Sequence, residues 1–299
     1  MERSARLTIA HRGASAHAPE NTLAAARLAH ALGADMWETD VQMTRDGVPV
    51  LLHDATLERT SDVAAHPEFA DRAPWRTDSF TLDEIRTLDA GSWFGTNDPF
   101  GTVASGELTE KELAPFIGET IPTLEEGLAL TRKLGWRVNI ELKNLAGSAG
   151  HETITRAVMD MIRKQAMEQS VCLSSFQSDY LREAASLSRS VPRGLLVEKG
   201  VPEKAQGLQH CGLCAGIYET LTVEEAIRLC RDAEADFFHP STAFLSADFV
   251  AALHDAGFPV NAWVIDEVKD ARTLLDWSVF GFITNYPGRL RKTLGPCAG

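Results

Sequence analysis

The fold is decided by the stretch from Ile9 to Asp54, which reads IAHRGASAHAPENTLAAARLAHALGADMWETDVQMTRDGVPVLLHD. The apolar run Leu7 to Ala10 stops at His11-Arg12-Gly13, a pattern that predicts a buried strand ending at a glycine turn. Reactive side chains at the carboxyl end of a buried strand are typical of a barrel enzyme. A helix over Asn21 to Ala31 follows, with Asn21 or Thr22 as its cap and Gly33 as its terminator.

The second half of this stretch predicts a hairpin. Asp46-Gly47 favours a two-residue turn between strand-like flanks, and such a turn places Asp40 directly opposite His53. Glu38 shares that sheet face because strand side chains alternate with period two. Pro49 lacks an N–H group and therefore favours a short edge ribbon. The spacing thus brings two carboxylates and an imidazole together.

A third carboxylate lies far downstream, in the sequence RVNIELK from Arg137 to Lys143. The alternation puts Asn139, Glu141 and Lys143 on one face of a strand. Glu38, Asp40 and Glu141 together offer the oxygen ligands that a hard divalent ion prefers, which makes Mg²⁺ or Ca²⁺ the expected metal, with Mn²⁺ as an alternative. Lys143 and Arg12 could then hold phosphate oxygens, the arginine in a bidentate manner.

Each of these motifs also has a structural interpretation. A single ExD or ExK pattern is usually the solvated face of a half-buried sheet, and one histidine is usually a packing or surface residue. Taken together, the motifs favour function, because like-charged carboxylates on one strand face repel each other unless a cation lies between them.

The chain resembles the glycerophosphodiester phosphodiesterases in ten ordered motifs that span nearly its whole length. These are HRG (11–13), PENT (19–22), ETD (38–40), DGVPVLLHD (46–54), DAGSWFG (89–95), IPTLEE (121–126), IELK (140–143), SSF (174–176), AWVID (262–266) and FITNYP (282–287). The resemblance implies a TIM-type (β/α)8 barrel in the α/β class, as a single domain over 1–299. It also implies a small insertion over the barrel mouth, approximately 55–120. The alternation of strand-like and helix-like segments by itself would also allow an open α/β sheet.

The resemblance also implies an activity, which is the metal-dependent hydrolysis of glycerophosphodiesters to sn-glycerol 3-phosphate and an alcohol such as choline or ethanolamine. His11 and His53 are then the general acid and base, since imidazole suits both proton roles. The sequence does not assign the two roles, and it leaves open whether a substrate hydroxyl or water attacks. Phe176 and Trp263 would line the substrate pocket, with ordinary core packing as the alternative.

Two positions near the C-terminus depart from the family pattern, which more usually has Asp-Gly and Thr-Asp where this chain has Phe280-Gly281 and Thr284-Asn285. We expect Asn285 to affect hydrogen bonding at the barrel end or the far end of the substrate, without loss of activity. The region from Val201 to Cys214 also matches the family poorly. It contains Cys211 and Cys214, whose CxxC spacing could be a redox pair or half of a zinc site.

Composition limits the partners. The chain has 299 residues, 44% of them hydrophobic, which is enough for one large core or two smaller ones. Its net charge of −13 disfavours nucleic acid and anionic membranes as partners. No signal peptide or run of about 20 apolar residues is evident, so a cytoplasmic location without a membrane anchor is expected. A small-molecule substrate is the expected partner, and the oligomeric state stays open.

Two further hypotheses come from other functional classes. A related phosphodiesterase could act on a lysophospholipid or sphingolipid, but it would favour an apolar or basic surface near the mouth. A non-catalytic barrel could bind phosphodiesters, but its catalytic positions would be degenerate, whereas His11, Glu38, Asp40, His53 and Glu141 are all present.

Overall fold

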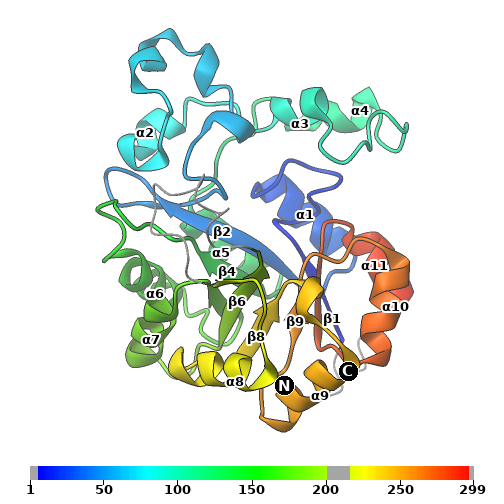
Figure 1. Cartoon of the computed structure of the whole chain (residues 1–299). Coiled ribbons are helices and arrows are strands. Elements are labelled where there is room, and N and C mark those ends of the chain that lie inside the picture. The colour runs from blue at the N-terminus through cyan, green and yellow to red at the C-terminus, as the bar shows by residue number, and fades with distance from the viewer. Residues whose placement is uncertain (1–5, 201–215, 296–299) are drawn as a thin grey trace.

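Eight parallel strands form a closed ring in the computed structural model, which describes residues 6–200 and 216–295 (Figure 1). Around the ring they are β1 (Leu7–Ala10), β2 (Met36–Met43), β4 (Val138–Leu142), β5 (Val171–Ser175), β6 (Arg193–Lys199), β8 (Phe237–Pro240), β9 (Asn261–Ala262) and β10 (Gly281–Thr284). The bridges Phe238–Val260 and Ser241–Trp263 join β8 to β9 and complete the ring. The predicted TIM-type barrel is therefore confirmed, and the open sheet is excluded.

Helices cover the outside of this ring (Figure 1). They are α1 (Leu23–Ala31), α5 (Leu124–Lys133), α6 (Ile154–Lys164), α7 (Ser178–Leu187), α8 (Val223–Asp232), α9 (Ala247–Asp255), α10 (Val268–Asp276) and α11 (Pro287–Leu294). As predicted, Thr22 caps α1. Thr123 and Thr222 form capping boxes that start α5 and α8. Each capping side chain satisfies a backbone N–H group that the first helical turn leaves without a partner.

Strand alternation separates the two faces of the barrel wall. In β4, Val138, Ile140 and Leu142 pack with the helices in the largest hydrophobic cluster, so Asn139 and Glu141 face the interior. The same alternation turns Leu7 and Ile9 inward, where they pack with Met36, Cys172, Phe280 and Ile283. The interior thus contains apolar side chains together with buried polar ones such as Asn139, His239 and Asn261, and the acidic inward positions of β2 and β4 lie toward the carboxyl ends of the strands.

The pairing of β2 with the antiparallel strand β3 (Pro49–Leu51) differs by one residue from the predicted register. Gln42 pairs with Val50. Leu52 lies opposite Asp40, and its backbone N donates to the Asp40 carbonyl oxygen at 3.1 Å. The prediction that Asp40 faces His53 across the ladder is therefore wrong.

The reason lies in the turn, which has the three loop residues 45–47 in place of two. Thr44 Oγ1 donates to Asp46 Oδ1 at 2.6 Å and accepts from the backbone N of Val48 at 2.9 Å. Gly47 follows with φ of 78°, a left-handed conformation. This combination is the common three-residue hairpin, in which a left-handed residue follows a tight turn. A side-chain hydrogen bond from Thr44 thus favours the longer loop.

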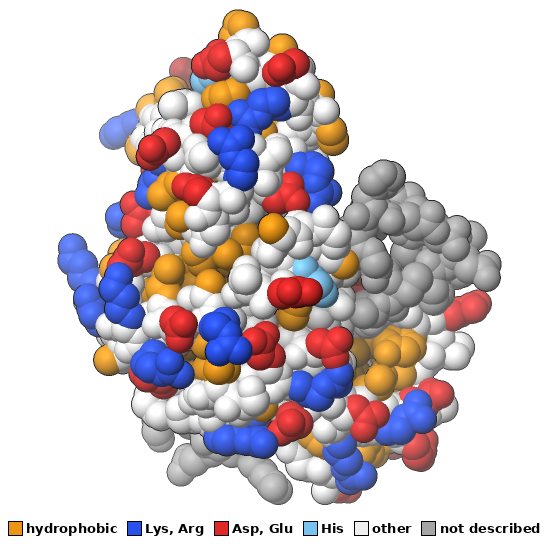
Figure 2. Space-filling model, turned by 90° about the vertical axis from the view of Figure 1, so that its left-hand side faces the viewer, with side chains coloured by type: hydrophobic (Ala, Val, Ile, Leu, Met, Phe, Trp, Pro, Cys, Tyr) orange, Lys and Arg blue, Asp and Glu red, His pale blue; other side chains and the backbone are white. Residues whose placement is uncertain are grey.

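The segment between β3 and α5 departs from the barrel alternation. It consists of 3₁₀ turns and three short helices, α2 (Leu82–Ile85), α3 (Ser92–Asn97) and α4 (Glu110–Leu113), and it lies above the strand ends in Figure 1. It has a hydrophobic cluster of its own around Phe69 and Phe80. In Figure 2 it forms the narrower upper lobe, and acidic and basic side chains are interspersed over that lobe and over the wider body.

Further features concern the edge of the sheet, the cysteine pair and the helices. Strand β9 is regular only over Asn261–Ala262, with single bridges at Val260 and Trp263. The two-residue strand β7 (Ile217–Tyr218) extends the sheet beside β6. Cys211 and Cys214 lie outside the described residues. In the part of the chain that the structure describes, no helix is long and apolar enough to cross a membrane.

The corrected hairpin gives a prediction about Gly47. Replacing it with alanine should lower the free energy of unfolding by about 1 kcal/mol, because a Cβ atom is strained at positive φ. Gly47→Asn should lower it less, since asparagine tolerates the left-handed conformation. Urea denaturation of the three proteins measures both effects. Equal stability of the alanine variant and the unchanged protein would contradict the turn geometry.

Candidate active site

Three buried carboxylates lie together at the carboxyl ends of adjacent strands. Glu38 and Asp40 point inward from β2, Glu141 points inward from β4, and one oxygen of each lies within 4.8 Å of the others. Asp40 pairs directly with Glu141 in the parallel register. Burial, and then the neighbouring carboxylates of Asp40 and Glu141, raise the pKa of Glu38 well above its usual value. The three groups therefore repel one another in a poorly solvated place.

Two cations face the cluster but compensate only part of its charge. Lys143 Nζ lies 3.3 Å from Asp40 Oδ1 and 2.6 Å from Glu141 Oε1. Arg12 Nε lies 3.2 Å from Asp40 Oδ2, and the Arg12 backbone N donates to Glu38 Oε2 at 2.9 Å. Although burial acts in the opposite direction, Lys143 and Arg12 hold the pKa of Asp40 well below its usual value. Three ionised carboxylates and two cationic side chains have a net negative charge, which a further cation would offset.

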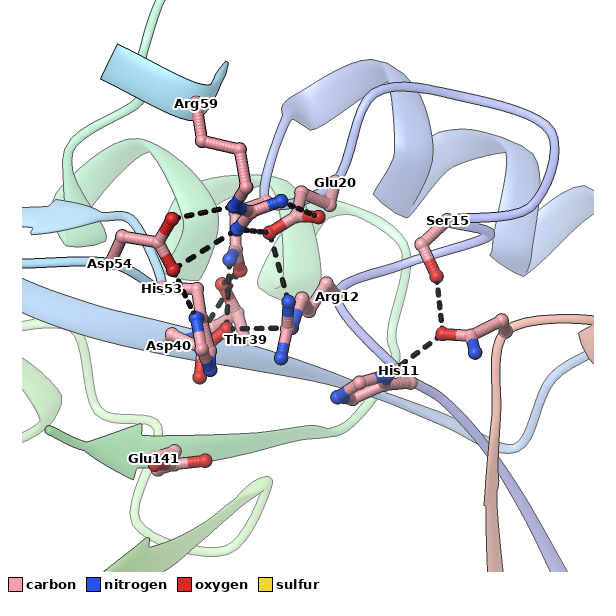
Figure 3. Close-up of polar contacts among 12 residues, drawn as sticks. His11, Arg12, Ser15, Glu20, Thr39, Asp40, His53, Asp54, Arg59 and Glu141 are labelled. Carbon is pink, nitrogen blue, oxygen red and sulfur yellow. Dashed lines mark hydrogen bonds and ion pairs between the residues drawn. The ribbon is translucent and has the colours of Figure 1, made fainter. Parts of the chain in front are cut away.

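His11 follows β1 and points into the same space (Figure 3). Its Nδ1 lies 2.7 Å from Asn285 Oδ1, and its Nε2 lies 4.0 Å from Glu38 Oε2. Burial, and then the charge of Arg12, lower the pKa of His11 to about 3. The ring is therefore neutral at neutral pH, and it carries one proton on one of its two nitrogens.

Asn285 determines which nitrogen of His11 carries that proton. The amide Nδ2 of Asn285 donates to Asp266 Oδ2 at 2.7 Å, and Ser15 Oγ donates to Asn285 Oδ1 at 2.8 Å. These two bonds fix the amide so that its oxygen faces His11, and only a protonated Nδ1 can donate to it. The Nε2 of His11 is left as a proton acceptor. Asn285 was expected to affect hydrogen bonding at the barrel end or the far end of the substrate. It does form a hydrogen bond at the barrel end, to Asp266, and it also holds His11 directly.

His53 reaches the site from beyond the end of β3. Its Nδ1 lies 2.6 Å from Asp54 Oδ1, and Asp54 accepts a second bond, from Arg59 Nε at 2.5 Å. Arg59 also donates to Glu20, which accepts from Arg12 at 3.0 Å (Figure 3). Although burial acts in the opposite direction, the bonds from His53 and Arg59 lower the pKa of Asp54. A chain of ion pairs thus connects His53 to Arg12 through the segment after β3.

The other predicted pocket residues occupy the opposite side of the mouth. Phe176 follows β5, Trp263 follows β9, and their rings meet edge to face with centroids 6.0 Å apart. Trp263 Nε1 donates to the carbonyl oxygen of His239 at 2.8 Å, which fixes the indole ring. Both side chains are half-buried, so they can pack and still contact a ligand.

The structure brings all nine predicted site residues to the same end of the barrel. The sequence interpretation missed the partners that orient the histidines, namely Asn285, Asp54, Arg59 and Glu20. Asp54 and Glu20 lie inside the motifs HD and PENT, which would have been a signal. Nothing local to His11 points to Asn285, which is 274 positions away.

The comparisons with known proteins decide the family. The sequence profile of the glycerophosphoryl diester phosphodiesterase family matches residues 11–289. The chain belongs to this family. The resemblance in the ordered motifs is therefore confirmed, and so is the assignment to an enzyme family.

Relatives in this family match the chain over nearly its full length. A glycerophosphodiester phosphodiesterase from Caldanaerobacter subterraneus is 32% identical and aligns over 95% of this chain and 96% of its own. One from Bacillus subtilis is 29% identical, over 96% of this chain and 85% of its own.

Solved structures of the family share the fold. A crystal structure from Silicibacter pomeroyi has a TM-score of 0.75 and 26% identity, covering 98% of this chain and 94% of that one. A phosphodiesterase from Oleispira antarctica, in complex with the product sn-glycerol-3-phosphate, has a TM-score of 0.68 and 25% identity, covering 97% of both chains.

The contact with Asn285 predicts the tautomer of His11. In protein labelled with ¹⁵N in histidine, the His11 shifts at neutral pH should show a protonated Nδ1 and an unprotonated Nε2. Asn285→Leu removes the acceptor and should redistribute the proton between the two nitrogens. His66, which is half-buried and contacts the carboxylates of Asp62 and Glu68, has no contact with Asn285 among the described residues and serves as an internal control. A protonated Nε2 in the unchanged protein would contradict the assignment.

Proposed function

We propose that the chain hydrolyses glycerophosphodiesters to sn-glycerol 3-phosphate and an alcohol, with one divalent metal ion and two histidines. The observation that carries the proposal is the convergence of Glu38, Asp40 and Glu141 with His11 and His53 at one end of the barrel. Family membership supports the same activity, because the Caldanaerobacter relative is named for it. The product in the Oleispira structure supports the expected phosphate ester.

The three carboxylates fit a hard divalent ion. Their oxygens are the ligand type that Mg²⁺ and Ca²⁺ prefer. Asp40 Oδ1 and Glu141 Oε1 are buried and face Lys143 Nζ at 3.3 Å and 2.6 Å. A carboxylate oxygen has more than one lone pair, so each can contact this ammonium and still serve as a ligand. Mg²⁺ or Ca²⁺ is the proposed metal, with Mn²⁺ as an alternative. When bound, such an ion would offset negative charge on the phosphoryl oxygens.

The contacts of the two histidines favour different roles. His11 has a neutral amide partner and presents an unprotonated Nε2, so it is suited to take a proton from the attacking oxygen. His53 is paired with the ionised Asp54, and such a partner stabilises a ring that carries the proton for the leaving alcohol. Arg12 and Lys143 would bind the phosphate oxygens. The attacking oxygen can come from a glycerol hydroxyl next to the phosphate or from water.

The wider description of the chain follows from this function. We propose that residues 1–299 form a single family domain, with residues of about 55–120 as an insertion over the mouth. Arg59 supports this role for the insertion, since it connects the segment to both His53 and Arg12. A cytoplasmic location and a soluble small-molecule substrate remain part of the proposal.

The decisive experiment is release of sn-glycerol 3-phosphate from a panel of glycerophosphodiesters by the purified protein. EDTA should abolish release, and Mg²⁺, Ca²⁺ or Mn²⁺ added back separately should show which ion restores it. His11→Ala and His53→Ala should each lower kcat by about 10²- to 10⁴-fold, the usual contribution of a general acid or base.

Glu141→Gln tests the metal site with nearly unchanged side-chain shape. It should raise the metal concentration needed for half-maximal rate, whereas the control Asp160→Asn, on the exposed face of α6, should not. No turnover of any soluble diester by the folded, metal-supplied protein would overturn the proposed function. Full activity after exhaustive chelation would overturn the role of the metal.

A further inference from the structure

Arg59 lies outside the barrel, in the short 3₁₀ turn Glu58–Thr60 that follows β3, and its guanidinium binds two carboxylates at once. Nε and Nη2 donate to the two oxygens of Asp54 at 2.5 Å and 3.2 Å. Nη1 and Nη2 donate to the two oxygens of Glu20 at 2.9 Å and 2.8 Å. The planar fork of a guanidinium suits such paired contacts, whereas an ammonium group is a point charge. This junction therefore depends on the shape of the Arg59 side chain as well as on its charge.

The first branch of the junction leads to His53. His53 and Asp54 follow β3 in a stretch without regular secondary structure, so no strand or helix fixes their side chains. Asp54 Oδ1 accepts from His53 Nδ1 at 2.6 Å, and within residues 6–200 and 216–295 the other side chain that bonds Asp54 is Arg59. The orientation of the His53 ring therefore depends on a carboxylate that Arg59 holds.

The second branch leads to Arg12. Glu20 is 10% exposed, and its Oε1 accepts from Arg12 Nη1 at 3.0 Å as well as from Arg59. Although burial acts in the opposite direction, the bonds from Arg59 and then the charge of Arg12 lower the pKa of Glu20, so this carboxylate is ionised at neutral pH. Through two carboxylates, Arg59 thus fixes where His53 lies relative to the arginine that would bind the phosphate (Figure 3).

We propose that Arg59 is a positioning residue, which aligns His53 with the leaving oxygen of a phosphodiester held at Arg12. This inference rests on the proposed function and adds a residue that acts through two others. In the step concerned, the bond between phosphorus and the leaving oxygen breaks, and its electron pair stays on that oxygen. The same oxygen takes the proton from His53 Nε2, so the alcohol departs neutral and His53 becomes a neutral ring. Removal of Arg59 therefore impairs proton delivery more than phosphate binding.

Two substrates with different leaving groups separate these effects. An alkyl ester of glycerol 3-phosphate needs a proton as its alcohol departs, whereas p-nitrophenolate departs without one. The alkyl ester is the member of the panel that the unchanged protein turns over fastest, for example glycerophosphoethanolamine, and the second substrate is the p-nitrophenyl ester. Arg59→Met should lower kcat for the alkyl ester by about 10- to 100-fold, which is part of the usual contribution of a general acid. It should lower kcat for the p-nitrophenyl ester by at most about threefold, because this ester does not require the acid.

A double variant tests whether Arg59 acts through Asp54. Asp54→Asn should by itself lower kcat for the alkyl ester, and the addition of Arg59→Met should lower it little further, because residues that act as a unit give non-additive losses. Arg59→Lys keeps the positive charge but not the fork, so it should retain part of the lost kcat. If Arg59→Met fails to fold, Arg59→Lys gives the same comparison of the two esters. The control Arg156→Met removes an exposed arginine of α6 that pairs with Glu183, and it should leave both kcat values unchanged.

Three outcomes would overturn the positioning role. Equal losses for the two esters would mean that Arg59 supports the fold or phosphate binding and not proton delivery. Full kcat for the alkyl ester in Arg59→Met would remove Arg59 from the reaction. Additive losses with Asp54→Asn would mean that Arg59 does not act through Asp54. All three require turnover by the unchanged protein, whereas its complete absence would refute the proposed function itself.

Discussion

The mutual repulsion of three buried carboxylates is the constraint on which the rest of this site depends. Glu38, Asp40 and Glu141 are 4%, 1% and 9% exposed, and a parallel register between β2 and β4 places Asp40 beside Glu141. Burial of like charges is costly, and it is tolerated only where cations or hydrogen bonds compensate. The side chains of Arg12, Lys143 and Asn21 all contact Asp40 for this reason. The remaining negative charge is what makes the cluster suited to a divalent ion.

The two histidines differ in their hydrogen-bond partners, and this difference favours a different proton-transfer role for each of them. Asn285 presents a neutral oxygen to His11, while Asp54 presents a carboxylate to His53. Asn285 is itself fixed by Asp266, and Asp54 is fixed by Arg59, so each histidine is oriented by a residue that is oriented in turn. Such second contacts decide which ring nitrogen can donate or accept a proton. An insertion outside the barrel, through Arg59, therefore takes part in orienting a residue of the site.

Much of this arrangement could be predicted from the sequence, because it depends on local periodicity. Period-two alternation placed Glu38, Asp40 and Glu141 on inward faces, and Thr22, one of the two expected caps, marked the start of α1 correctly. The hairpin register could not be predicted from Asp46-Gly47 alone, because the side chain of Thr44 stabilises a longer loop. Asn285 could not be paired with His11, since closure of the barrel is what brings β10 beside β1.

The account depends most on a cation among the three carboxylates, and crystals soaked in Mn²⁺ test this directly. An anomalous difference map should show one peak within coordination distance of Glu38, Asp40 and Glu141, and Glu141→Gln should weaken or remove it. A peak elsewhere in the barrel, or none at a Mn²⁺ concentration that supports hydrolysis, would contradict the central claim.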